Sequence, residues 1–111
     1  AKFPQENFLL FLMGCVKHIR DVGALEMAGH TLFSMAAGGL RDHVGEGFHR
    51  YCIDRAWRVP HFEKMLYTQA LLGRAYAELH RLTGNPYAAD VAEATLRFAL
   101  AQLRSPEGVF Y

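Results

Sequence analysis

The stretch GGLRDHVGEGFHRYCIDRAWRVPHFEKMLY, residues 38–67, decides how this chain is divided. It holds three of the six histidines, the single tryptophan and a dense mixture of arginine, aspartate and glutamate. It is the one long segment without helical periodicity, whereas the segments on both sides have it. Reactive side chains on an irregular segment between helices are typical of binding and catalytic sites. We therefore expect a site here; charges that only pair with one another are the simpler alternative.

The flanking segments are predicted to form two pairs of antiparallel helices. Apolar residues recur in them at three- and four-residue spacing, which favours helix. Gly38 and Gly39 are expected to end the second helix through a left-handed cap. Pro60 and Pro86 are expected to open the third and fourth helices. The fold class is therefore all-α, with predicted helices over residues 4–20, 24–37, 60–82 and 86–104.

The pattern within each predicted segment indicates what it buries. Residues 8–16 are apolar on every side, which predicts a helix buried on most faces. They are too few to cross a bilayer, which needs about 20 residues, so no membrane association is expected. The fourth helix is expected to face outward with a polar stripe formed by Asp90, Glu93, Arg97 and Arg104. Residues 48–59 predict a short β-hairpin or an irregular loop.

The second and fourth predicted helices resemble each other, which suggests an internal repeat. Ala28, Thr31 and Leu32 correspond to Ala92, Thr95 and Leu96. Each helix is followed by a glycine-aromatic loop, at residues 46–48 and 107–110. A helical hairpin followed by such a loop would repeat after about 60 residues, longer than common helical repeats. We therefore expect both helices to end on the same face, with the two loops together.

Composition limits the class of protein. A length of 111 residues suits one small domain, and the net charge of +1 is too balanced for the basic surface that nucleic acid requires. There are two cysteines, Cys15 and Cys52, and no CxxC motif. Neither a disulfide framework nor a zinc knuckle is indicated, so free thiols and a cytoplasmic location are expected.

Several strings together resemble one known family. They are KFP at residues 2–4, RDHVGEGFHRY at 41–51, DRAWRVPHFEKMLY at 54–67 and SPEGVFY at 105–111. Across essentially the whole chain they resemble the family of spermatogenesis-associated protein twenty, whose bacterial members are called thioredoxin domain-containing proteins. Members carry a thioredoxin-like domain followed by a toroid of six helical hairpins, similar to N-acylglucosamine 2-epimerase and six-hairpin glycosidase folds.

The resemblance implies that residues 1–111 are a single partial domain. They would form about two of six hairpins of an (α/α) toroid, with the thioredoxin-like domain absent. Redox activity is therefore not carried over to this chain. The implied partners are the remainder of the toroid, a thioredoxin-like domain in the parent protein and a carbohydrate ligand.

The epimerases that this fold resembles move the proton at carbon 2 of a sugar with histidine, glutamate and arginine side chains. By that resemblance, His61 and His49 are acid/base candidates, with Glu63 near the start of the third helix. A histidine at a helix N-terminus is biased towards its neutral form, which suits a general base. Arg50 or Arg41 would stabilise the developing oxyanion.

Other polar and aromatic residues of the stretch are candidates for holding the substrate. Trp57, Tyr51 and Phe48 could stack on a pyranose face, and Lys64 lies beside the acid/base pair in sequence. A glycosidase would instead need two carboxylates about 5–10 Å apart, and no spacing selects a pair. The expected substrate-binding residues are Arg41, Asp42, Tyr51, Asp54, Trp57 and Lys64.

Two further interpretations stay open. His49, Cys52 and His61, with Asp54, have an admissible spacing for metal binding but match no recognised zinc pattern, so we expect neither a metal nor a cofactor. The favoured function is a carbohydrate-active domain of the epimerase or glycosidase type, with a pocket rim at residues 41–63. The alternative is a non-catalytic binding or scaffold module of a protein that contains a thioredoxin-like domain.

Overall fold

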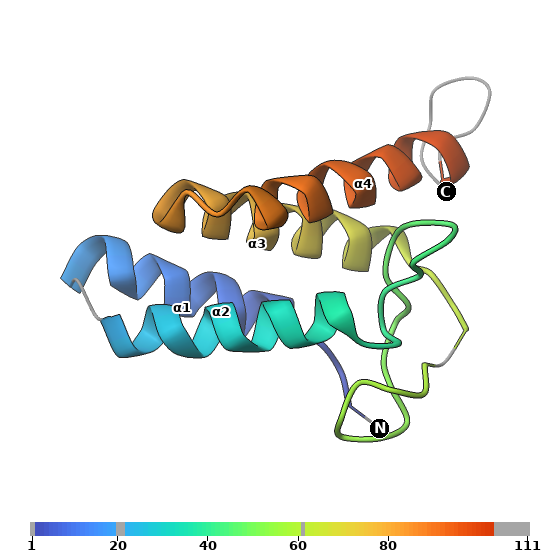
Figure 1. Ribbon diagram of the computed structural model, residues 1–111, viewed down its shortest axis with the longest axis horizontal. Coiled ribbons are helices and arrows are strands. Elements are labelled where there is room, and N and C mark those ends of the chain that lie inside the picture. The colour runs from blue at the N-terminus through green and yellow to red at the C-terminus, as the bar shows by residue number, and fades with distance from the viewer. Residues whose placement is uncertain (1, 20–21, 61, 104–111) are drawn as a thin grey trace.

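The computed structural model describes residues 2–19, 22–60 and 62–103 of the chain. Within these residues the backbone forms four α-helices and only isolated β-bridges. The predicted all-α fold class is confirmed. The helices are α1 (Glu6–Ile19), α2 (Val22–Ala37), α3 (Leu66–Thr83) and α4 (Pro86–Gln102), as Figure 1 shows.

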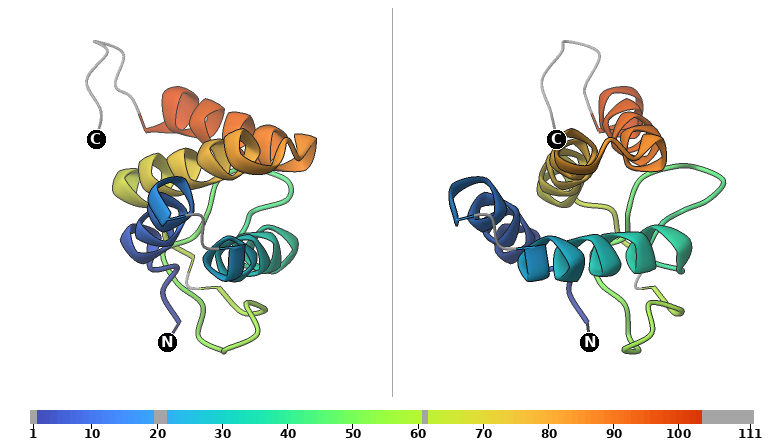
Figure 2. Two further views of the ribbon diagram at one scale, coloured as in Figure 1. Left: turned by 90° about the vertical axis from the view of Figure 1, so that its left-hand side faces the viewer. Right: turned by 60° about the vertical axis from the view of Figure 1, so that its left-hand side comes forward.

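The helices pack as two antiparallel pairs, α1 with α2 and α3 with α4. Helix α3 also contacts α1, which joins the two pairs (Figures 1 and 2). The buried core draws on all four helices and the loop, with Leu32 and Met35 of α2 and Leu72 and Tyr76 of α3 among its fully buried side chains. The phenol of Tyr76 donates a hydrogen bond to the carbonyl of Leu32. Residues 38–60 and 62–65 cross one end of this bundle (Figure 1).

Helix α3 begins six residues later than predicted, at Leu66 rather than Pro60. The chain before it is used for other backbone contacts. Pro60 forms an antiparallel bridge with Cys52, and the Glu63 carbonyl accepts a 2.7 Å hydrogen bond from the Arg50 amide. These contacts hold the backbone extended. The prediction that Glu63 lies at a helix N-terminus is therefore wrong, and His61 lies outside the described residues.

The paired glycines after α2 act through close approach rather than through a left-handed cap. Neither Gly38 nor Gly39 has a positive φ. A methyl group on Gly38 would come within 2.5 Å of the Trp57 carbonyl oxygen, and one on Gly39 would overlap the carbonyl of Arg58. The left-handed cap instead follows α3, at Gly84, whose φ is 73°. Glycine is needed at 38 and 39 because the loop backbone packs directly on them.

The region predicted as a β-hairpin or an irregular loop is an irregular loop. Its extended contacts are the bridge between Cys52 and Pro60 and a 2.8 Å hydrogen bond from the Ile53 amide to the Val59 carbonyl. Lys2 adds a second bridge to Cys52. The N-terminal segment is therefore paired with the loop.

Helix α1 buries fewer faces than its composition predicts. Leu9 and Met13 are buried against α2 and α3, but Phe8 is 50% exposed and Phe11 64% exposed. Only two helices cover α1, which leaves its third side open. No helix in the described part of the chain is long and apolar enough to span a membrane.

The expected geometry of the second and fourth helices is found in part. Helices α2 and α4 end at the same end of the bundle (Figure 1), and Glu46, in the loop after α2, lies 3.3 Å from Arg97 of α4. Asp90, Glu93 and Arg97 face outward as predicted. Arg104 and the second glycine-aromatic loop lie outside the described residues.

One side chain fixes the loop to α3. The amide of Gln69 is fully buried, and its Nε2 donates to the carbonyl of Phe48 at 2.6 Å. Its Oε1 accepts from the Phe48 amide at 2.7 Å. The Phe48 ring stacks on Tyr76 with 5.5 Å between ring centroids. A buried backbone donor and acceptor are thus both satisfied by one side chain, as buried polar groups require.

We expect Gln69→Leu to destabilise the chain by about 2–4 kcal/mol, because it leaves two buried backbone groups without partners. Urea unfolding followed by circular dichroism measures the change. The matched control is Gln102→Leu at the exposed end of α4, expected to change the free energy of unfolding by less than about 0.5 kcal/mol. Equal effects of the two substitutions would refute the anchoring role of Gln69.

Candidate functional site

Eight of the nine described candidate residues fall into three groups in the loop between α2 and α3, and Arg41 lies apart from them. Asp42, Lys64 and His49 form the first group, and Arg50, Glu63 and Tyr51 the second. Asp54 and Trp57 belong to a separate turn. The chain therefore brings together the segments around residues 42, 49 and 64, and their role in a pocket rim stays a prediction.

Asp42 and Lys64 form an ion pair that holds the first group together. The Lys64 ammonium donates to Asp42 Oδ2 and to the Glu46 carbonyl, each at 2.8 Å. The other carboxylate oxygen of Asp42 accepts from the amides of Val44 and Gly45. The hydrogen bond from Lys64 and then those two amides lower the pKa of Asp42 well below its usual range. Lys64 also lies 4.4 Å from the centroid of the Phe98 ring, which connects the loop to α4.

His49 is buried beside this pair. The His49 and Phe62 rings pack edge to face with 5.2 Å between their centroids, and His49 Nδ1 has no hydrogen-bond partner among the described residues. Burial lowers the pKa of His49, the positive charge of Lys64 lowers it further, and the charge of Asp42 opposes this. The imidazole is thus biased towards its neutral form with one ring nitrogen unused. Such a group can accept a proton from a ligand.

The second group lies towards solvent. Arg50 Nη1 is 3.7 Å from Glu63 Oε1, and its Nε donates to the Tyr67 hydroxyl at 3.4 Å. The Tyr51 ring packs on Phe3 with 4.8 Å between centroids. Both members of the ion pair are about 40% exposed, so it contributes little to stability. These side chains can reach a ligand only by exchanging or sharing these contacts.

Asp54 holds the turn that carries Trp57. Its carboxylate accepts from the amides of Ala56, Arg58 and Val59, and these bonds, led by that of Val59, lower the pKa of Asp54. Trp57 has a φ of 59°, a left-handed conformation that is rare for a bulky residue. Its side chain is only 4% exposed, so its ring faces are not open for stacking on a sugar.

Arg41 lies at the edge of the site, towards α4. Its Nη1 donates to the Tyr87 hydroxyl at 3.3 Å, whereas its buried Nε has no hydrogen-bond partner. Arg41 forms no ion pair with a described carboxylate. Its guanidinium therefore retains donors for a developing negative charge.

Cys52 is not placed to act as a nucleophile or a metal ligand. Its side chain is fully buried, and burial raises the pKa of the thiol to about 11. Within the described residues, no three histidine, cysteine, aspartate or glutamate side chains converge as a metal ion requires. The proposed role of His61 in proton transfer stays a prediction, because that residue is not described.

Sequence reasoning missed two residues that shape the site. Gln69 lies among the apolar residues of α3, and a lone amide in such a position signals a buried hydrogen-bonding role. Lys2 was assigned no role. Its ammonium lies 4.5 Å from the centroid of the Trp57 ring and donates to the Arg55 carbonyl at 2.8 Å. No local pattern connects residues 2 and 57.

We expect Asp42→Asn to reduce stability by about 1 kcal/mol at pH 7, the upper range for a partly exposed ion pair. A carboxyl whose pKa is lowered by folding stabilises the protein above its unfolded value, about 3.9, and ceases to do so as the pH falls through the folded pKa. The difference between wild type and variant should therefore shrink between about pH 4 and pH 2 in urea unfolding. Asp90→Asn on the outer face of α4 serves as the control. A difference that does not change with pH would contradict the ion pair.

Comparison with known proteins identifies relatives over nearly the whole chain. No protein-family model matches it. Human spermatogenesis-associated protein 20 is 53% identical over 114 aligned residues, which cover 99% of this chain and 14% of the human protein. The rat protein of the same name is 50% identical over the same extent. An uncharacterized protein of Caenorhabditis elegans is 52% identical over 74% of this chain.

These relatives are much longer than the chain, which spans about one seventh of the mammalian proteins. The similarity drawn from the motifs at residues 41–67 is therefore confirmed for spermatogenesis-associated protein 20, whereas the toroid and the bacterial relationship stay predictions. The described helices and loop are similar, along almost their entire length, to one segment of spermatogenesis-associated protein 20.

Proposed function

We propose that this chain is part of a carbohydrate-active (α/α) toroid in a longer polypeptide, and that the loop of residues 41–63 forms part of its pocket rim. The observation that carries the proposal is the state of His49: buried, biased towards neutrality and with Nδ1 unpaired. Burying a ring nitrogen without a hydrogen-bond partner costs free energy of folding, which a ligand that pairs with this nitrogen would offset. A sugar hydroxyl or an acidic C–H bond would supply such a partner.

The proposed reaction is epimerisation at carbon 2 of an open-chain aldose. The neutral imidazole of His49 takes the proton from carbon 2, and the electron pair of the broken C–H bond passes to the carbonyl oxygen as an enolate. Arg41, which has unused donors, stabilises the negative oxygen. His61 is the second acid/base candidate and returns a proton to the opposite face of carbon 2. The protein gains no net proton over the cycle once solvent re-equilibrates the two imidazoles.

The test is incubation of the longer polypeptide with N-acetylglucosamine or mannose in deuterated water, with NMR detection of deuterium at carbon 2. We expect exchange in the wild type and a loss of at least 100-fold in His49→Gln, the size of a typical acid/base contribution. His80→Gln is the matched control, because His80 is exposed on α3 and bonds only the Asn85 carbonyl there. Exchange that is unaffected by His49→Gln and by His61→Ala would show that these residues do not catalyse it.

A second candidate function is a non-catalytic binding or scaffold module, and a specific observation favours it. The carboxylates of Asp42, Asp54 and Glu63 all bind groups within the loop itself. Carboxylates that bind groups within the loop stabilise the loop conformation rather than a ligand. Sugar-dependent thermal stabilisation of the longer polypeptide without any exchange at carbon 2 would support this function over catalysis.

The outer face of α3 and α4 supports the placement within a larger helical domain. A hollow of about 420 Å³ there is lined only by apolar residues, of which Leu96 is 43% exposed and Leu100 50% exposed. We propose that the next helical hairpin of the same polypeptide occupies this face. The relatives extend far beyond the matched segment, so chain is available to supply it.

With this face uncovered, the 111-residue chain is expected to self-associate as its concentration rises, because exposed apolar patches favour association. Light scattering over a concentration series measures it. Leu100→Glu should shift the chain towards monomer, whereas Val44→Glu, at a loop position that is 96% exposed, should not. A compact monomer at all concentrations would contradict the uncovered face.

A further inference from the structure

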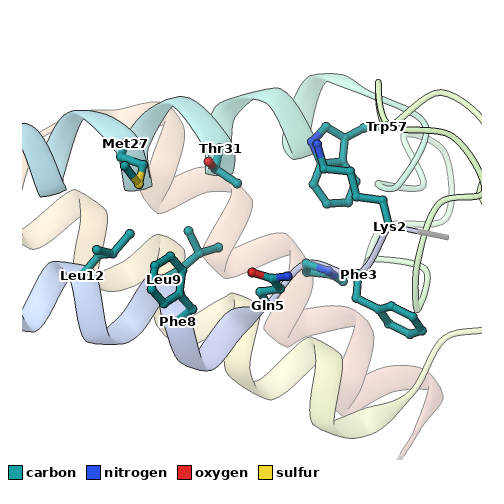
Figure 3. A pocket seen from close by; sticks show the side chains of 10 residues that line it. Lys2, Phe3, Gln5, Phe8, Leu9, Leu12, Met27, Thr31 and Trp57 are labelled. Carbon is teal, nitrogen blue, oxygen red and sulfur yellow. The ribbon is translucent and has the colours of Figure 1, made fainter.

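A groove between α1 and α2 combines an apolar floor with a cationic end. Its larger part is a cavity of about 340 Å³ between the two helices, shown in Figure 3. Thr31 and Trp57 also line an adjoining cavity of about 250 Å³. Together the two parts have the size of a small-molecule site. Of the ten site residues predicted from sequence, only Trp57 lines either part.

The apolar part follows α1 for about two turns. Phe8, Leu9 and Leu12 line it from α1, and Met27 faces them from α2, as Figure 3 shows. From Glu6 to Leu12 the helix rises about 9 Å, close to the length of an alkyl chain of about eight carbons. Phe8 and Met27 are each at least half exposed, so this part is open to an entering chain.

The other end of the groove carries positive charge without a balancing carboxylate. Lys2, His30 and Arg55 line it together with the hydroxyls of Thr31 and Ser34. No aspartate or glutamate is among the described residues that line either part. Asp54 is adjacent in sequence, but its oxygens accept the backbone amides of its own turn.

Lys2 is held in place for binding. Its backbone pairs with Cys52, where the Cys52 amide donates to the Lys2 carbonyl at 2.8 Å. Its ammonium is fixed by the Arg55 carbonyl and the Trp57 ring, as given above, and has no ion pair with a described carboxylate. An ammonium has three donors, so at least one remains for an anionic ligand.

We propose that this groove binds a single-chain amphiphilic anion. Its carboxylate or phosphate head lies at Lys2, Arg55 and the hydroxyl of Ser34. Its alkyl chain of about eight carbons lies along the apolar floor between α1 and α2. The ligand supplies the negative charge that the cationic end lacks and covers the exposed faces of Phe8 and Met27. This site is separate from the loop around His49 and does not depend on the function proposed for it.

The test uses the 111-residue chain and three probes that share one alkyl chain: octanoate, octyl phosphate and octanol. Isothermal titration, below the micelle concentrations, measures affinity. The fluorescence of Trp57, the single tryptophan, reports whether the probe enters this groove. We expect at least one anion to bind at least tenfold more tightly than octanol. Whichever anion binds better identifies the head group.

Two substitutions and one control locate the binding. Lys2→Met should weaken the preferred anion at least tenfold and leave octanol unchanged. Met27→Glu, at a position that is 55% exposed and therefore tolerant, should weaken all three probes. Arg97→Met removes one positive charge on α4 and should change none of them. Equal affinity for octanol and both anions, or anion binding that survives Lys2→Met, would overturn the proposal.

Discussion

The two hydrogen bonds between the Gln69 amide and the backbone of Phe48 are the constraint on which the site depends. They place a loop residue in the core of a helical bundle, where its backbone would otherwise be unsatisfied. His49 follows Phe48 directly, so the same anchor sets the position of the imidazole. The glycine at position 47 is part of this arrangement, since its φ is 81° and the Phe98 ring and Gln69 lie against it. The loop is thus tied to both α3 and α4 at this point.

The helices could be predicted from sequence because each depends on local patterns. Apolar spacing identified all four, and the position of Pro86 marked the start of α4 correctly. The start of α3 was misplaced because a proline is compatible with both a helix start and an extended segment. The choice was made by Cys52 and Arg50, whose backbones pair with residues 60 and 63. Contacts between residues eight and thirteen positions apart in an irregular segment have no signature in a periodicity pattern.

The contacts of the site likewise divide into local ones, which sequence can predict, and ones between distant segments, which it cannot. The turn held by Asp54 is local and typical of an aspartate that binds the amides that follow it. The pairing of Asp42 with Lys64 spans 22 residues, and the contact of Lys2 with Trp57 spans the N-terminal segment and the loop. Neither could be derived without the fold. The lack of helical periodicity marked this stretch as lying between helices, whereas the division of its residues into three groups came only from the geometry.

The burial of Cys52 makes its thiol a measure of how often the loop opens. Alkylating reagents react with thiolate, and at a pKa of about 11 only roughly one thiol in ten thousand is ionised at pH 7. The side chain is also fully buried, and the backbone of Cys52 is bridged to Lys2 and to Pro60. Labelling must therefore await a transient separation of these strands. In a protein whose other cysteine is replaced, the labelling rate would measure how fast the loop opens. It would therefore also measure the lifetime of the closed loop.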